Sequence, residues 1–334
     1  MGDEGWWVGD RMSAVLYLDR HGVKVGASQG RLTLKVSGGE EQALPLHQVE
    51  QVIVLAHAHF SHDAIAVLLT EGIPVVFSGL RGGFRGTLSG QPGRQIMRRK
   101  QQYRAMDDSA QSLRVACALV QAKLRGHSRL LRQWQVPRQH AIAGALLATH
   151  HCRDVGTLRG HEGAAARAFF EGLRQHLEGS LFVFEQRQQH PPPDPVNSLL
   201  SLAYTLLINE VEVGVAAAGL DSAGGFYHAA GDGRPTLLMD LVEPLRPLAD
   251  RFSARLLKSE LSPDDFSTDG DRCLLRDGRR GIVYKAWERL LSSKIAWRGE
   301  HISWRRLIHY QARELAQWLD GNILAPRFWH LDDA

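Results

Sequence analysis

The strongest constraint on the fold is a change of hydrophobic pattern near residue 96. Before about residue 90, short β-rich runs such as "SAVLYLD", "QVEQVIVLAH" and "GIPVVFSG" are typical of strands. From Ile96 onward, apolar residues recur every three or four positions, as they do on one face of a helix: Leu113, Ala116, Cys117, Val120 and Leu124. This change predicts two lobes with different secondary structure.

The N-terminal lobe carries further turn and helix signals. "KVGASQGRLTLKVSGG" predicts a hairpin with turns at "SQG" and "SGG", and "SHDAIAVLLTEG" predicts a short helix with a serine cap that ends at Gly72. A Gly-rich basic connector, "SGLRGGFRGTLSGQPGR", follows. We therefore expect an α+β protein: a small N-terminal β-rich lobe with a short helix (residues 1–92), then a large C-terminal all-α lobe (residues 93–334).

Composition excludes several classes of protein. The chain has 334 residues, of which 44% are hydrophobic, so it can build a core. No apolar run approaches the roughly 20 residues that cross a bilayer, and the acidic start "MGDEGWWVGDRMS" makes a poor signal peptide. Three widely spaced cysteines argue against a disulfide framework and a zinc finger. We expect a cytoplasmic protein without a membrane partner.

Positive charge is concentrated in one part of the chain. Residues 81–138 hold thirteen Lys or Arg and only two acidic residues, Asp107 and Asp108. This excess indicates a polyanionic partner. A solvated helix face is the alternative, but "RRKQQYR" places several like charges within one or two turns, where they repel unless a partner neutralises them.

The segment "GLDSAGGFYHAAGDGRPTLLMDLVEPLRP" holds the clearest candidate chemistry. His228 lies in a glycine-rich loop, and Asp240 and Glu243 share one face of the helix that follows. Because Asp240 stands among apolar residues, it must be paired, hydrogen-bonded or bound to a metal. A histidine with two carboxylates suits Mn²⁺ or Mg²⁺. An ion pair of Asp240 or Glu243 with Arg246 or Arg251 is an equal alternative.

Three other patterns allow less decisive interpretations. Glu162 opens the small-residue helix "GHEGAAARAFFEGL", where a first-turn glutamate commonly complements the helix dipole. Asn197 caps the apolar helix that follows the proline-rich loop 188–197. His57 and His59, with His62 nearby, match the metal site of amidohydrolase barrels. Such a barrel needs repeated strand–helix units, which the helical remainder of the chain lacks.

Several blocks in a fixed order resemble one known family. "LYLDRHGVKVGASQGRLTL", "LPLHQVEQVIVLAHAHFSHDAIAVLLTEGIPVVF" and "RRKQQYRA" look like the β lobe and the start of the helical lobe of the CRISPR-associated adaptation integrase. "HEGAAARAFF", "NSLLSLAYTLL", "GLDSAGGFYH" and "LLMDLVEPLRPLADR" look like the blocks of its active lobe, and "LSPDDF" fits its end. The resemblance runs across almost the whole chain.

The resemblance implies a role for each matching residue. Glu162, His228 and Asp240 match the three ligands of a catalytic Mn²⁺ or Mg²⁺. Some relatives carry a further aspartate where this chain has Leu237, so no acidic helper is assigned there. Glu243 and Asn197 are expected to support the site from an outer shell. The basic residues expected to neutralise DNA phosphates are Arg94, Arg98, Arg99, Lys100 and Arg104.

The implied function is a metal-dependent DNA endonuclease and integrase of CRISPR adaptation. It would insert spacer DNA into the CRISPR array by attack of a 3′-hydroxyl on a phosphodiester. The implied partners are double-stranded and branched DNA, a second copy of the chain in a homodimer, and a small second adaptation protein. The alternative is a non-catalytic, architectural DNA-binding subunit of the same complex.

Overall fold

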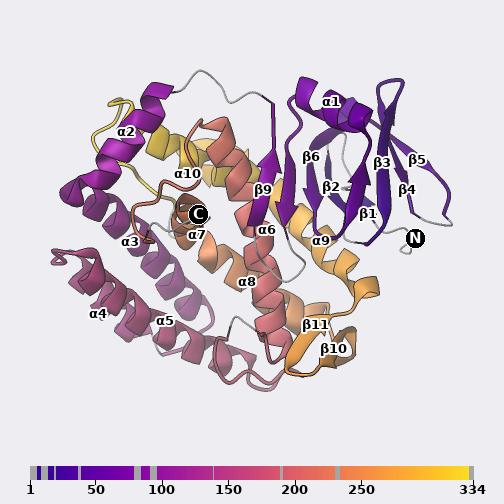
Figure 1. Ribbon diagram of the computed structural model, residues 1–334. Helices are drawn as coiled ribbons and strands as arrows, with labels where there is room; N and C mark the ends of the chain where they lie inside the picture. Colours follow the sequence, from indigo (N-terminus) through magenta and orange to yellow (C-terminus); the bar gives the residue numbers. More distant parts are fainter. Residues whose placement is uncertain are drawn as a thin grey trace. The chain divides into compact units, whose positions relative to one another are not determined.

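The computed structural model describes residues 6–8, 14–18, 20–36, 39–78, 84–90, 96–137, 139–188, 191–229 and 234–330 (Figure 1). The chain divides into two compact units. Unit 1 consists of Met1–Gly93 together with Asp277–Arg289, and unit 2 consists of Arg94–Arg276 and Leu290–Ala334. The sequence patterns gave no sign that residues 277–289 belong with the N-terminal strands.

Unit 1 is built from two sheets and a short helix, α1 (His62–Thr70). The five-stranded sheet has the order β1-β2-β6-β8-β9, in which β2, β6 and β8 run parallel and the two edge strands run antiparallel. The four-stranded sheet has the order β5-β4-β3-β7. The strands are β1 (Trp6–Val8), β2 (Ala14–Leu18), β3 (Val23–Ser28), β4 (Arg31–Lys35), β5 (Gln42–Pro45), β6 (Val49–Val54), β7 (Ala58–Phe60), β8 (Val75–Ser78) and β9 (Phe84–Leu88).

These elements confirm the β-rich N-terminal lobe and its short helix. The Ser61 hydroxyl accepts the Ala64 N–H at 3.1 Å, which satisfies one of the free donors at the start of α1. Alternate residues of both sheets and the inner face of α1 form one apolar core, with Leu18, Val25, Val52 and Leu68 at its centre. The two sheets and α1 therefore fold around a single hydrophobic centre.

Helix α9 (Asp277–Ser292) contributes residues 277–289 to unit 1 through specific contacts. The rings of Tyr17 on β2 and Tyr284 on α9 stack with centroids 4.9 Å apart. The Tyr17 hydroxyl also donates a hydrogen bond to Glu288 Oε1 at 2.9 Å. Because both tyrosine rings are fully buried, this contact belongs to the core of the unit.

The histidine pair that suggested a hydrolase barrel lies in unit 1. His59 is on β7, His57 just precedes this strand, and both side chains are exposed. The sheet that contains β7 pairs β7 parallel to β3, and β3 and β4 antiparallel to each other. This is not the closed ring of parallel strands that an amidohydrolase barrel requires.

Unit 2 is mainly helical, as the 3.6-residue pattern predicted. Asp108 separates α2 (Ile96–Asp107) from α3 (Ser109–Gln133), because its carboxylate caps α3 by accepting hydrogen bonds from the N–H groups of Ala110 and Gln111. An all-α lobe was expected, but unit 2 also contains two short β-hairpins, residues 266–275 and 294–303. The elements are α2 (Ile96–Asp107), α3 (Ser109–Gln133), α4 (Gln139–Thr149), α5 (Val155–Leu177), α6 (Pro195–Ala217), α7 (Thr236–Val242), η2 (Glu243–Leu245), α8 (Arg246–Ser259), β10 (Phe266–Asp269), β11 (Arg272–Leu275), β12 (Lys294–Trp297), β13 (Glu300–Ser303) and α10 (Trp304–Leu319).

Helix α6 forms the core of unit 2. By length and composition it is apolar enough to cross a membrane, contrary to the expectation that no apolar run is long enough, but 78% of its most apolar stretch is buried inside the protein. It begins at Pro195, and the cap is Asp194 rather than Asn197. The Asp194 carboxylate accepts the Asn197 N–H at 2.8 Å, so Asn197 lies inside the first turn and has another role.

Candidate active site

A cavity of about 250 Å³ in unit 2 brings together charged residues that are far apart in the sequence. Two carboxylates, Glu162 and Glu243, face it beside the imidazole of His228. The other residues that line the cavity are Lys123, His127, Ala166, Phe170, Arg187, Tyr204 and Arg246. Acidic, basic and imidazole groups therefore share one small concave surface.

Glu162 reaches the cavity from the middle of a helix. α5 begins at Val155 and is capped by Asp154, so Glu162 lies two turns inside rather than at the helix start. An interaction with the helix dipole weakens beyond the first turn, so it does not explain this glutamate. The Glu162 side chain is 18% exposed and forms an ion pair with the Lys123 ammonium.

His228 is held by Asp240 in a defined orientation. Asp240 Oδ1 lies 2.7 Å from His228 Nδ1 and also accepts the His228 backbone N–H at 2.9 Å. Because an ionised carboxylate can only accept hydrogen bonds, Nδ1 carries the proton, and in the neutral ring Nε2 is left with the lone pair. Nε2 lies 4.0 Å from Glu243 Oε1.

The loop before His228 approaches α7 closely. A Cβ atom on Gly225 would lie 2.7 Å from the Thr236 carbonyl carbon, so only glycine allows this approach. As a result, the backbone N–H groups of Phe226 and Tyr227 both reach Asp240 Oδ2, the latter at 2.9 Å. Asp240 is fully buried, and both of its oxygens are hydrogen-bonded. This geometry differs from that expected of a metal ligand, because Asp240 does not line the cavity.

Glu243, which was expected in an outer shell, lines the cavity itself. Its Oε2 accepts from Lys123 Nζ at 2.6 Å and its Oε1 accepts from Arg246 Nε at 2.8 Å. Helix α3 brings Lys123 here because Gly126 packs directly on Pro247. A Cβ atom on Gly126 would lie only 2.7 Å from Pro247 Cγ, so a larger residue would push the two helices apart. The ion-pair alternative thus holds for Glu243 with Arg246, while Asp240 binds backbone N–H groups and His228.

The buried charges hold one another in their ionised forms. Burial alone raises the pKa of Glu243, but Arg246 and Lys123 outweigh this effect and lower the pKa to about 2. Burial by itself lowers the pKa of Lys123. The nearby carboxylates of Glu243 and Glu162 raise it by more than this, so the pKa of Lys123 lies above its ordinary value. The cavity therefore contains a stable ammonium between two carboxylates.

A second layer of polar contacts supports the cavity wall. The Asp250 carboxylate accepts a hydrogen bond from the Tyr204 hydroxyl, and its Oδ2 lies 2.9 Å from His127 Nε2. The Arg187 guanidinium donates to Asn197 Oδ1 at 2.8 Å, while the Asn197 amide donates to the Gln186 carbonyl at 2.9 Å. Asn197 thus orients a cation that faces the cavity.

The donor set fits a hard divalent ion in kind. Two carboxylates and one imidazole suit Mn²⁺ or Mg²⁺, and a histidine that ligates a metal usually donates its other N–H to a carboxylate, as His228 does to Asp240. Within the part of the chain that the structure describes, no three such side chains stand close enough to hold an ion as they are. The Lys123 ammonium takes the position between the carboxylates.

The predicted DNA-binding residues differ in their surroundings. On α2, Lys100 and Arg104 are exposed, whereas Arg98 forms an ion pair with Asp320 and donates to the Ala218 carbonyl. Arg99 donates to the Gly219 carbonyl at 3.3 Å. Arg94 lies outside the described residues. Arg98 and Arg99 therefore join α2 to the end of α6, and the role of this group in DNA binding stays a prediction.

Comparison with known proteins places this chain in a family. The family model for "CRISPR associated protein Cas1" matches residues 16–289. The chain is 34% identical over 279 residues to CRISPR-associated endonuclease Cas1 1 of Thermus thermophilus, which covers 83% of this chain and 86% of that protein. This chain belongs to the Cas1 family.

Other similarities extend this Cas1 assignment. A Cas4/Cas1 fusion of Rhodospirillum rubrum is 34% identical over 332 residues, which are 94% of this chain but only 57% of the fusion. Among solved structures, a casposase bound to integration product matches with a TM-score of 0.85 at 21% identity, over 96% of this chain and 94% of that chain. A chain of a Cas6-RT-Cas1–Cas2 complex matches with a TM-score of 0.81 at 20% identity, over 98% of this chain and 37% of that chain. The two structural matches show that the Cas1 fold is shared.

Three basic residues that line the cavity, Lys123, His127 and Arg187, were not anticipated from sequence. Lys123 lies on the apolar face of α3, together with Val120 and His127. A lysine and a histidine on a stripe that should be apolar are a detectable signal of a buried polar site. Arg187 follows no such pattern because it lies in an irregular loop before α6.

Proposed function

We propose that this chain is a divalent-metal-dependent DNA endonuclease and integrase that inserts spacer DNA into a CRISPR array. The observation that carries the proposal is the pairing of a carboxylate-held imidazole, His228, with two carboxylates on one cavity. Family membership supports the reaction class, since a relative is named an endonuclease and a solved structural relative is a casposase with its integration product.

The carboxylates of Glu162 and Glu243 and the Nε2 atom of His228 would hold the ion. A bound Mn²⁺ or Mg²⁺ would polarise the phosphoryl oxygen and offset negative charge in the transition state. Asp240 accepts a hydrogen bond from His228 Nδ1–H, so the lone pair on Nε2 points away from Asp240. In this proposal Glu243 takes the ligand role first assigned to Asp240, because Asp240 already receives four hydrogen bonds.

The cations of the cavity have a separate task. Arg187 lines it, and contacts with Asn197 and Ser201 hold its guanidinium in place. The fixed positive charge of a guanidinium attracts a phosphate oxygen and can help to position the phosphodiester. The attacking group is the 3′-hydroxyl of the incoming strand during integration and water during hydrolysis. Lys100 and Arg104 would contact the DNA backbone without reading its sequence.

The proposed partners are double-stranded and branched DNA, a second copy of this chain and a small second protein. A structural relative occurs in a complex with Cas2, which supports the third of these. The second copy is carried over from the family resemblance. Each partner can be added or withheld in the test that follows.

The test is strand transfer of a short duplex into a repeat-bearing plasmid, with Mn²⁺, Mg²⁺ or chelator, and with or without the small partner. We expect Glu162→Gln and Glu243→Gln to abolish transfer and to weaken Mn²⁺ binding measured by calorimetry. Asp240→Asn should retain weak binding, reduced about 10–100-fold, because it disturbs only the orientation of His228.

Asp269→Asn, an exposed carboxylate of β10, serves as the control and should match the unsubstituted protein. Full activity of Glu162→Gln, or equal activity in chelator, would contradict the proposed reaction. Loss of Mn²⁺ binding in Asp240→Asn alone, with normal binding in Glu243→Gln, would return the ligand role to Asp240.

A further inference from the structure

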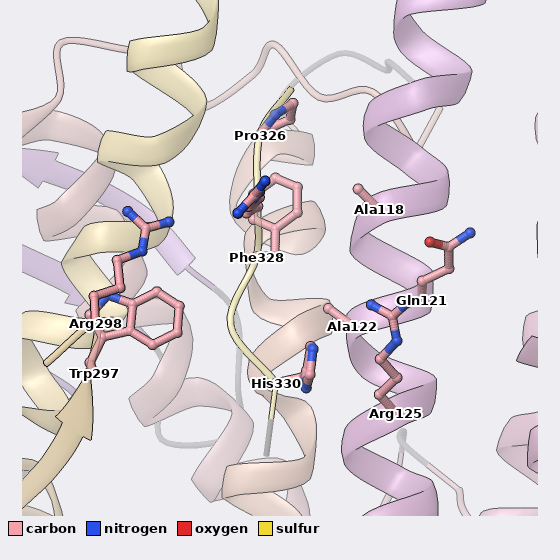
Figure 2. A pocket seen from close by; sticks show the side chains of 10 residues that line it. Ala118, Gln121, Ala122, Arg125, Trp297, Arg298, Pro326, Phe328 and His330 are labelled. Atoms are coloured by element: carbon pink, nitrogen blue, oxygen red, sulfur yellow. The ribbon is translucent and has the colours of Figure 1, made fainter. Parts of the chain in front are cut away.

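A second cavity of unit 2 lies along another face of α3 (Figure 2). Its volume of about 520 Å³ falls within the range of roughly 300–1,000 Å³ that is typical of small-molecule sites. Arg125 of α3 lines it, two residues after Lys123, which faces the candidate active site. Residues two apart on a helix do not face each other, so the two cavities are separate.

Three segments form the walls of this cavity. Figure 2 shows Gln121 and Arg125 projecting from α3, Trp297 and Arg298 at the end of β12, and the C-terminal segment that carries Phe328. The walls thus come from three places in the sequence that the fold of unit 2 assembles. No step of the proposed strand transfer uses them.

The charge of the lining favours an anion. Among the ten described residues that line the cavity, three are arginines and none is Asp or Glu. Arg298 is neutralised by Glu314 at 2.7 Å, but within the described part of the chain neither Arg125 nor Arg327 has an ion-pair partner. Two guanidinium groups therefore face one concave surface with no ion-pair partner among the described residues, and this positive charge attracts a negatively charged ligand.

The rest of the lining favours a planar ring beside that anion. Trp297 is partly exposed, with the Arg298 guanidinium 5.0 Å from its ring centroid, and Phe328 supplies a buried apolar wall. Guanidinium groups match the oxygens of a phosphate in a two-pronged geometry, and aromatic side chains stack on nucleobases. The Gln121 amide adds a donor and an acceptor that can pair with a base edge.

We propose that this cavity binds a nucleoside phosphate. The same chemistry belongs to a free nucleotide and to the terminal nucleotide of a DNA strand. Because α3 separates the cavity from the carboxylates, the nucleotide held here is not the one that reacts. Binding needs no metal ion, so it can be measured in chelator, where failure of the proposed integrase reaction has no effect on the result.

The test is calorimetry of the full chain in chelator with four probes: deoxyadenosine monophosphate, deoxyadenosine, inorganic phosphate and a 5′-phosphorylated single-stranded hexanucleotide. We expect the monophosphate to bind at least about tenfold more tightly than either the nucleoside or phosphate, because it alone uses both the arginines and the aromatic wall. Arg125→Gln and Arg327→Gln should each weaken its binding about tenfold, as expected for loss of a charge-assisted contact.

Arg174→Gln is the matched control, since Arg174 is an exposed arginine of α5 that does not line the cavity. Arg327 is itself exposed, so its substitution tests binding without disturbing the fold. A hexanucleotide that binds much more tightly than the monophosphate identifies a DNA strand as the ligand, and equal affinity identifies a free nucleotide. Absence of monophosphate binding, equal binding of phosphate alone, or normal binding by Arg327→Gln would overturn the proposal.

Discussion

At the scale of single residues, burial and a place on the cavity wall are separate properties. Asp240 is fully buried, but three backbone N–H groups and the His228 imidazole satisfy it, so its charge requires no ion. Glu243 is almost as buried, yet it faces the cavity. The sequence places both on one face of a predicted helix and does not distinguish them. The discriminating feature is the loop at Gly225, whose N–H groups reach only Asp240.

Lys123 should be essential for the stability of the site when no metal is bound. Its ammonium forms ion pairs with Glu162 and with Glu243, and Lys123→Met would leave both carboxylates without this partner. Breaking a buried ion pair in this way costs about 3–5 kcal/mol. We expect a decrease of this size in the free energy of unfolding, measured with denaturant in chelator.

The matched control is Lys294→Met, which removes an exposed lysine of β12 and should change stability by less than about 0.5 kcal/mol. Under the proposed function, Mn²⁺ should restore part of the loss in Lys123→Met, because it would replace the missing positive charge. If Lys123→Met were as stable as the control variant, the ammonium would not be a structural cation.

At the scale of elements, α3 is the organising helix of unit 2. One face carries Lys123 to the candidate active site, and another lines the arginine-rich cavity. Between them, Gly126 lets α3 touch Pro247 at the start of α8. This close approach positions the Lys123 ammonium near Glu243, so the packing of two helices determines the electrostatics of the site.

Gly126→Ala should therefore be destabilising even though alanine favours helices. Its Cβ would lie 2.7 Å from Pro247 Cγ, and a proline ring cannot move aside as a flexible side chain does. Overpacking of this kind costs typically 1–3 kcal/mol. Gly144→Ala on α4 is the control, because its Cβ meets nothing within 4 Å, and there we expect a gain of about 1 kcal/mol.

Thermal and denaturant unfolding of the two alanine variants provides the measurement. Opposite signs at the two glycines are the expected result. Equal stabilisation at both positions would show that α3 and α8 separate easily, and that the position of Lys123 does not depend on this contact.

At the scale of the whole molecule, acid should weaken the fold through His176. Burial of its ring, and secondly the charge of Lys258, lower its pKa to about 4. The ring stacks on Trp134 with centroids 4.3 Å apart. Between pH 6.5 and about 4, the unfolded chain binds a proton that the folded protein does not, so stability falls as pH falls through this window.

His176→Gln should flatten this part of the pH dependence. Because the ring is only about half buried, the expected effect is about 1 kcal/mol at most. The measurement is denaturant unfolding at pH 7, 5.5 and 4.5, with His301→Gln, an exposed histidine of β13, as the control. If the free energy of unfolding of His176→Gln falls with acid as steeply as that of His301→Gln, His176 is not a source of acid sensitivity.

Much of the architecture was predictable because it rests on local periodicity. The alternation in "SAVLYLD" and the spacing from Leu113 to Leu124 depend on neighbours a few residues away, and both predicted the correct element. The meeting of Glu162 and His228 at one cavity came from the family resemblance, since 66 residues separate them. The presence of Arg187 and Glu243 on the cavity wall, and the hydrogen bonding of Asp240 to the loop at Gly225, depend on tertiary contacts that no local pattern encodes.

Unit 1 is built from two distant parts of the chain, and this has a consequence for biosynthesis. Tyr17 stacks on Tyr284 and binds Glu288, so the N-terminal strands meet a core partner that is translated more than 250 residues later. At the usual elongation rates of about 5–20 residues per second, the growing chain waits roughly 13–55 s between these events. During that interval the face of β2 that holds Tyr17 is open on the ribosome. The first sheets to emerge from the ribosome are thus among the last parts of the protein to be completed.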